Sequence, residues 1–213
     1  MDKFELRRDR YEAFRKYQNP LLNLSVVARL PEFRPYCKER QLAPFHFLLY
    51  CLYMGVKEAD NFLYREFDGN VIKIEKFYGG YTVINLDNNL NYARFDVSND
   101  RAEFISRSLA AGVVARSTRE LINTGRDLSP RDQKDNIYTT CMPWLDLRAI
   151  EHPIYEYKTA DIPLIAWGRY SVLAGDTMTV PFCIQAHHGF VDGYHVHLLL
   201  QRLAERIAQE MAI

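Results

Sequence analysis

Polar and apolar residues alternate over several short stretches of the chain, a period that predicts half-buried β-strands. The segments "NLSVVARL" (23–30) and "YTVINL" (81–86) predict strands. The stretch "FLYREFDGNVIKIEKF" predicts a β-hairpin, because its Asp68-Gly69 pair suits a two-residue turn. Further strands are expected in "NIYTTCMPWLDL", "IPLIAWGRYSVL" and "DTMTVPFCIQAHH".

Other stretches follow helical spacing instead. The charged segment "LRRDRYEAFRKY" predicts a short helix near the start of the chain. Residues 41–59 are almost wholly apolar and too long for one strand, so we expect a buried helix there. Ser98 is expected to cap a helix over 99–123 that stops near Gly125.

The C-terminal part of the chain predicts an amphipathic helix that begins at Asp192. Its apolar positions recur at helical spacing: Val196, Leu199, Leu200, Leu203, Ile207 and Met211. The polar stretch "GRDLSPRDQKD" predicts a surface loop. Because strands and helices mix without a regular βαβ alternation, we predict an α+β fold with a mixed or antiparallel sheet.

Composition indicates a globular chain with a sizeable core. It has 213 residues, of which 48% are hydrophobic and 25% charged, and we expect one domain over 1–213. Lysine and arginine balance aspartate and glutamate at 27 each. This neutrality argues against nucleic-acid or anionic-membrane binding, although a small basic patch for one phosphorylated ligand remains allowed.

Cysteine spacing and hydropathy bear on redox chemistry and location. The four cysteines form no C-x-x-C pair, so neither a zinc site nor a disulfide framework is expected. The N-terminus lacks the apolar run of a signal peptide, and no stretch reaches the ~18 apolar residues of a membrane span. We therefore expect a cytoplasmic protein.

The segment "QAHHGFVDGYHVHLLL" holds four of the six histidines. His187 and His188 stand where a strand ends, and Asp192 takes the N-cap position of the last helix. Adjacent strand residues point to opposite faces, so one of the two histidines is expected to be structural. His195 and His197 lie two apart, on different faces of a helix.

Three interpretations of this segment remain open from the residues alone. The histidines are core or surface groups and Asp192 only caps a helix, or His188 joins a metal site, or His188 is a general base. The metal interpretation lacks H-E-x-x-H spacing. The catalytic one has a physical basis, because the ordinary pKa of histidine lies near neutral pH.

The same segment resembles a known family. "HHGFVDG" is similar to the H-H-x-x-x-D-G signature of chloramphenicol acetyltransferases and of dihydrolipoyl acyltransferase catalytic domains. Other landmarks follow in the order of the first group: "RRDRYEAF", "LAPFHFLLY", "FDGNVIKIEKFYGGYTVI", "TCMPW" and "WGRY…GD…VPFCIQAHH". The resemblance covers nearly the whole chain and implies a two-layer fold with helices packed on one face of the sheet.

The resemblance implies acetyl transfer from acetyl-CoA to a hydroxyl, with no metal. His188 would be the general base, and His187 would be structural. Asp192 would pair with an N-terminal arginine, Arg7, with Arg8 as the close alternative. Thr140 takes the place of a serine that donates to the oxyanion, although its extra methyl stiffens χ1.

Several positions carry weaker implications. Arg169 stands where a basic residue approaches CoA, or it faces solvent. Phe14 and Tyr92 match aromatic positions of the acceptor pocket, or they are core or interface aromatics. Ala166 replaces a threonine that holds a water in the family, and Arg94 replaces a small residue.

The resemblance further implies a homotrimer whose active sites lie at subunit boundaries, with chloramphenicol as the best-known acceptor. Transfer to another hydroxylated small molecule is an alternative, as is a non-catalytic member that binds an acyl-CoA or a hydrophobic ligand. A dihydrolipoyl acyltransferase core is disfavoured, because no lipoyl-like domain or linker is seen. Pocket residues come from scattered loops, so the sequence does not identify the acceptor.

Overall fold

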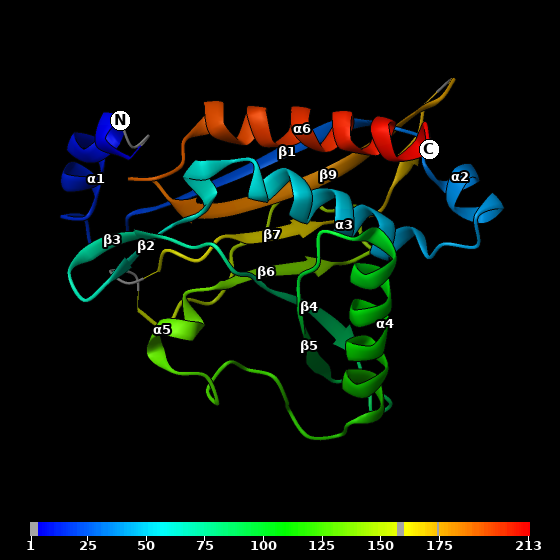
Figure 1. Cartoon of the computed structure of the whole chain (residues 1–213), viewed down its shortest axis with the longest axis horizontal. Coiled ribbons are helices and arrows are strands. Elements are labelled where there is room, and N and C mark those ends of the chain that lie inside the picture. Colours follow the sequence, from blue (N-terminus) through cyan, green and yellow to red (C-terminus); the bar gives the residue numbers. More distant parts are fainter. Residues whose placement is uncertain (1–3, 157–159, 174) are drawn as a thin grey trace.

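A seven-stranded sheet forms the centre of the computed structural model, which describes residues 4–156, 160–173 and 175–213 (Figure 1). Along the sheet the strands follow the order β1 (Leu21–Pro31), β9 (Thr177–His187), β7 (Leu164–Trp167), β6 (Asn136–Cys141), β4 (Tyr78–Ile84) and β5 (Leu90–Asp96). The short β8 (Ser171–Val172) pairs with β9. Strands β4, β6 and β7 run parallel and the other pairs are antiparallel, so the sheet is mixed.

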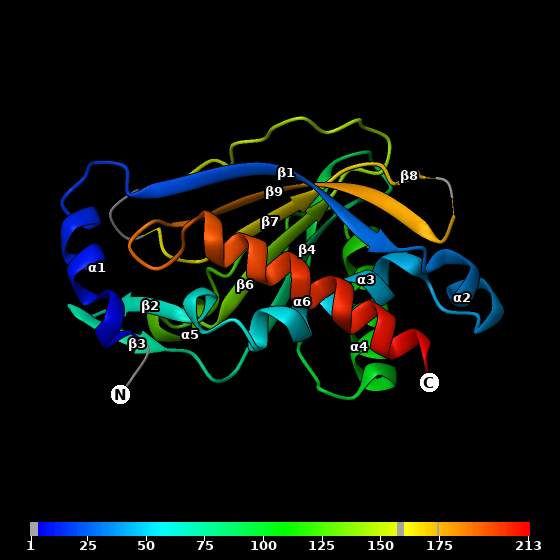
Figure 2. The same ribbon diagram turned by 90° about the horizontal axis from the view of Figure 1, so that it is seen from above.

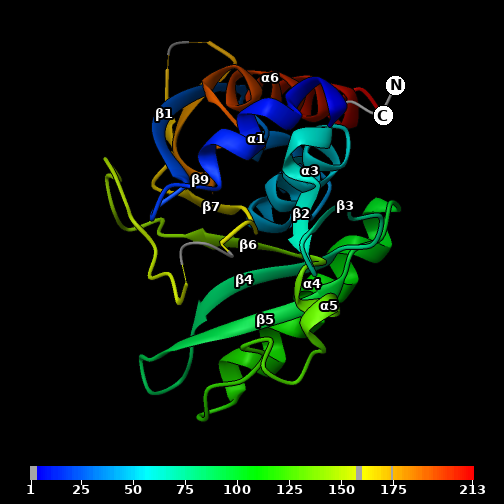
Figure 3. The same cartoon turned by 90° about the vertical axis from the view of Figure 1, so that its left-hand side faces the viewer.

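Helices cover one face of this sheet (Figures 2 and 3). Three long helices do so: α3 (Pro44–Lys57), α4 (Arg101–Ser117) and α6 (Gly193–Met211). Helix α3 is buried along almost its whole length, as its apolar sequence predicts. The predicted α+β fold, with helices packed on one face of a mixed sheet, is confirmed. No helix among the described residues is long and apolar enough to span a membrane.

The shorter elements lie around this layer. They are η1 (Glu5–Arg7), α1 (Arg8–Phe14), α2 (Arg34–Glu39), η2 (Asp60–Phe62) and α5 (Pro130–Gln133). Strands β2 (Tyr64–Phe67) and β3 (Asn70–Lys73) form the predicted hairpin, with positive φ at both Asp68 and Gly69. Helix α1 and this hairpin lie at the same end of the molecule (Figures 1 and 3).

The sheet face away from α3, α4 and α6 is called the open face below. Alternation along the strands assigns residues to it: Ala28 and Leu30 of β1 are buried in the core, whereas Val27, just before them, is 67% exposed. Residues 142–156, which follow β6, run along this side of the sheet (Figures 2 and 3). Apolar residues at the exposed positions include Val27, Ile84 and Leu90.

The helix that contains residues 101–117 differs from the prediction at both ends. Asp100, not Ser98, is the N-cap, and its carboxylate accepts from Glu103 N at 2.8 Å. The helix stops at Ser117, because the buried Asn91 amide donates to the carbonyls of Ala115, Thr118 and Glu120. Asn91 belongs to β5, a strand that the sequence pattern did not predict.

Candidate active site

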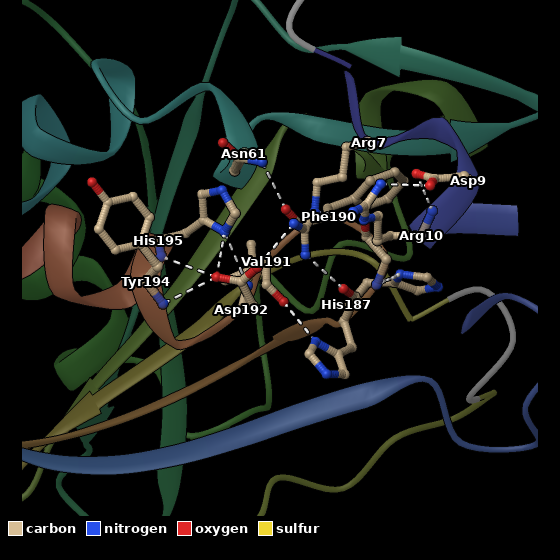
Figure 4. A network of polar contacts seen from close by, with 12 residues as sticks. Arg7, Asp9, Arg10, Asn61, His187, Phe190, Val191, Asp192, Tyr194 and His195 are labelled. Carbon is tan, nitrogen blue, oxygen red and sulfur yellow. Dashed lines mark hydrogen bonds and ion pairs between the residues drawn. The ribbon is translucent and has the colours of Figure 1, made fainter. Parts of the chain in front are cut away.

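The turn after β9 is held by the cap of helix α6. The Asp192 carboxylate accepts from Tyr194 N at 3.0 Å and from His195 N at 3.4 Å. His195 Nδ1 in turn accepts from Asp192 N at 3.1 Å, which completes a capping box. The turn that carries His188 is therefore fixed to the first turn of a long helix (Figure 4).

Arg7 ties the N-terminal segment to the same turn. Its guanidinium donates to Gly189 O at 2.9 Å, to His188 O at 3.1 Å and to the Asp192 carboxylate at 2.9 Å (Figure 4). Arg8 instead pairs with Glu5. Of the two arginines named from the sequence, the structure therefore places Arg7 against Asp192.

The His188 ring is oriented by a backbone carbonyl. Its Nδ1 lies 3.0 Å from Val191 O, and a carbonyl oxygen only accepts, so Nδ1 carries the proton. In the neutral ring Nε2 is then the unprotonated nitrogen, which is the tautomer that a general base needs. The Phe14 ring packs against the imidazole, with 4.0 Å between centroids, so two of the predicted site residues lie together.

His187 differs from its neighbour in every contact. It is 3% exposed, packs beside the stacked rings of Tyr11 and Phe190, and its Nδ1 accepts from Gly189 N at 3.0 Å. Burial lowers the pKa of His187 to about 4, so the ring is neutral at physiological pH. Gly189 is needed beside it, because an added Cβ would lie 2.9 Å from the Tyr11 Cα.

A second group of predicted residues lies on the open face. Thr140 of β6 and Thr82 of β4 are hydrogen-bonded through their hydroxyls, and Thr82 is the cross-strand partner of Tyr92 on β5. On its other side Thr140 pairs with Ala166 of β7. The Ala166 side chain is buried and offers no hydroxyl in this row.

The two groups do not meet within one chain. Thr140 aligns through Ala166 with Cys183 of β9, and His188 follows five residues later along that strand direction. Two strand spacings of ~4.8 Å and five rises of ~3.3 Å place His188 and Thr140 roughly 19 Å apart at Cα. One chain therefore cannot bring both side chains to the same carbonyl group.

Arg169 lines a pocket of about 350 Å³ on the open face. The pocket also contains Arg148, Ser171 and Thr179, with Asp146 as its one carboxylate. Arg169 donates to Trp144 O at 2.7 Å and lies 3.6 Å from the Asp146 carboxylate, and its side chain is half-exposed. The two guanidinium groups and the hydroxyls suit an anionic ligand.

The Arg94 side chain is held in an ion pair. It pairs with Asp127 through contacts of 3.0 and 2.6 Å, and this hydrogen bonding raises the pKa of the guanidinium. Its cross-strand neighbour on β4 is Gly80, where an added Cβ would lie 3.1 Å from the Tyr138 ring.

Sequence reasoning missed the contacts that hold α1 in place. Tyr11 OH donates to the Glu66 carboxylate, and Arg15 lies 3.4 Å from the same group. These residues are 51 and 55 positions apart, so no local pattern signals the contact. Thr82 was also missed, because a threonine in a strand is ordinary.

Metal chemistry finds no ready site. Within residues 4–156, 160–173 and 175–213, no group of three or more His, Cys, Asp or Glu side chains is arranged to hold a metal ion.

Comparison with known proteins connects this geometry to a family. The chain is 19% identical over 197 residues to a chloramphenicol acetyltransferase of Bacillus pumilus, covering 92% of this chain and 86% of the relative. A solved chloramphenicol acetyltransferase superposes with a TM-score of 0.83 at 22% identity, covering 94% of each chain. The Azotobacter vinelandii dihydrolipoamide acetyltransferase shares the fold, with a TM-score of 0.66 at 15% identity, covering 98% of this chain and 90% of the other.

The likeness extends beyond these individual proteins. The family model described as chloramphenicol acetyltransferase matches residues 2–204. That span includes α1, the seven strands of the sheet and the turn from His188 to Asp192. The chain therefore belongs to the chloramphenicol acetyltransferase family of acyltransferases.

Proposed function

We propose that this protein transfers the acetyl group of acetyl-CoA to a hydroxyl of a small molecule, with chloramphenicol as the first candidate acceptor. The observation that carries the proposal is the fixed tautomer of His188: Nδ1–H donates to Val191 O, which leaves Nε2 unprotonated. Family membership supplies the reaction class, and the imidazole supplies a base suited to it.

In the proposed reaction His188 Nε2 removes the proton of the acceptor hydroxyl. The oxygen attacks the thioester carbonyl and a tetrahedral oxyanion forms, to which the Thr140 hydroxyl donates. The intermediate collapses, the C–S bond breaks, and the proton held on His188 passes to the leaving CoA thiolate. Products are the acetyl ester and free CoA, with no covalent acetyl-enzyme.

Positioning falls to the residues around the base. Arg7 and Asp192 hold the turn, because the guanidinium binds the Asp192 carboxylate and the carbonyls of His188 and Gly189. They relay no proton, because arginine stays protonated and Nδ1 of His188 donates to Val191 O. Phe14 packs on the base, and Tyr92 lies beside the Thr82–Thr140 pair, where each would contact the acceptor. Arg169 would bind a phosphate of CoA.

Two copies of the chain are needed for this chemistry. The separation of roughly 19 Å between His188 and Thr140, estimated from strand geometry, supports an active site in which His188 of one copy faces Thr140 of another. Exposed apolar residues on the open face, such as Val27 and Ile84, support a subunit interface there. A homotrimer with three such sites agrees with both the separation of His188 from Thr140 and the exposed apolar residues.

The test is release of free CoA from acetyl-CoA with and without chloramphenicol. We expect acceptor-dependent release that His188→Ala lowers by about 10²–10⁴-fold. His197→Ala is the matched control, because His197 is exposed on α6, and it should behave as wild type. A folded His188→Ala protein with wild-type turnover contradicts the general base. If CoA is released only with a different hydroxylated acceptor, the proposed reaction stands and the proposed substrate is wrong.

A further inference from the structure

A pair of hydroxyl groups lies on the open face at the centre of the sheet. Thr82 Oγ1 and Thr140 Oγ1 are hydrogen-bonded, although the residues are 58 positions apart in the sequence. Both side chains are half-buried, and they come from β4 and β6, neighbouring strands that run parallel. The contact joins the proposed oxyanion donor to a residue that has no assigned role.

The single proton on each hydroxyl determines which threonine donates in this hydrogen bond. A threonine hydroxyl carries one proton and two lone pairs. If Thr140 donated its proton to Thr82, none would remain for an oxyanion. Thr140 donates to an oxyanion only when it accepts from Thr82.

We infer that Thr82 is a positioning residue for catalysis: its hydroxyl donates to Thr140 Oγ1 and so directs the single Thr140 proton at the thioester carbonyl oxygen. The inference rests on the proposed acetyl transfer and adds a second residue to its oxyanion site. A hydroxyl that already accepts a hydrogen bond is also polarised to donate more strongly.

The contact also settles which way the Thr140 side chain turns. Threonine occupies a few staggered χ1 wells, and a hydroxyl partner on one side favours the well that faces it. The backbone is held independently, because Thr139 Oγ1 donates to Gly80 O at 2.9 Å. A change at Thr82 therefore alters the aim of the Thr140 hydroxyl without freeing the strand.

The experiment measures kcat and KM for Thr82→Val, which removes the hydroxyl and keeps the branched shape. We expect kcat to fall by about 5- to 20-fold, less than the 10²–10³-fold typical of losing an oxyanion donor outright. KM for acetyl-CoA should stay within about two-fold, because ground-state binding is unchanged. Thr82→Ser should restore most of kcat. Thr177→Val, at the far end of β9, is the matched control and should match wild type.

A double-mutant comparison separates the effect of Thr82 on the direction of the Thr140 hydroxyl from its effect on packing. In a Thr140→Val background, Thr82→Val should change kcat by less than about two-fold, because residues that act as a unit are not additive. A full additional loss in that background overturns the inference, as does a Thr82→Val protein within two-fold of wild type. A wild type that acetylates no acceptor overturns the proposed function itself, whereas an active wild type with an insensitive Thr82→Val overturns only the role of Thr82.

Discussion

At the scale of single residues, His187 and His188 show how environment separates two identical side chains. The His187 ring packs beside two aromatic rings and is 3% exposed, and burial lowers its pKa to about 4. The His188 ring instead meets Phe14 on one side, and its Nδ1 is fixed by Val191 O. The first histidine is a neutral packing group, and the second has the protonation pattern of a base.

Stability should therefore fall in mild acid. An unfolded histidine binds a proton below its ordinary pKa of about 6.5, whereas folded His187 resists protonation until about pH 4. Between these values the unfolded state binds more protons, so the free energy of unfolding falls as pH drops, by on the order of 3 kcal/mol in full. His46, also buried, has its pKa lowered to about 4 by burial and adds to the slope.

Urea denaturation at several pH values measures this effect. His187→Gln is expected to be less stable at neutral pH and to show a shallower loss of stability in acid than wild type. His197→Gln, on the exposed face of α6, should keep the wild-type slope. An unfolding free energy for wild type that stays constant from about pH 7 to about pH 5 contradicts the buried, neutral His187.

At the scale of elements, α1 is a short helix held by its side chains. Seven residues are too few for a helix to be stable alone, so tertiary contacts must keep it in place. Arg7 holds its N-terminal end to the turn after β9, and Tyr11 with Arg15 holds it to Glu66 of β2. Glu66 is itself fixed, because its backbone N–H donates to the buried Asp161 at 2.5 Å.

Removing the Tyr11 hydroxyl tests this account of α1. Tyr11→Phe should lower the free energy of unfolding by about 1–3 kcal/mol, because Glu66 loses a hydrogen bond inside the protein. Acetyl transfer should fall a few-fold, since α1 carries Phe14, which packs on His188. Tyr17→Phe is the control, at a tyrosine that is 59% exposed. Equal unfolding curves for the two variants would show that the contact with Glu66 contributes nothing.

The local sequence pattern predicted most helices and strands. It failed where a residue far away in the sequence determines where an element ends. The hairpin at Asp68-Gly69, the buried helix α3 and the cap at Asp192 each depend on neighbours in sequence, and the structure has all three. The end of α4 depends on Asn91, and β5 has no strong alternation to signal it. For the site, the H-H-x-x-x-D-G signature is contiguous, whereas Thr82 meets Thr140 only through the strand order of the sheet.

At the scale of the whole molecule, the groups proposed for catalysis lie at two separate places. His188, Phe14 and Arg7 lie together where β9 ends, whereas Thr140 and Thr82 lie on the open face near the middle of the sheet. In the proposed reaction, one place holds the base and the other holds the oxyanion donor. The account therefore predicts that activity belongs to an assembly of copies and not to one chain.

Mixing two inactive variants tests this central claim most directly. His188→Ala and Thr140→Val, carrying different affinity tags, are refolded together, and mixed oligomers are purified through both tags. If each site takes His188 from one copy and Thr140 from its neighbour, every mixed trimer has both intact groups at one of its three sites, so about a third of the sites are complete. Activity near that fraction of wild type, far above either variant alone, is the predicted result. Mixed oligomers that form but stay as inactive as the parent variants would contradict a site shared between copies.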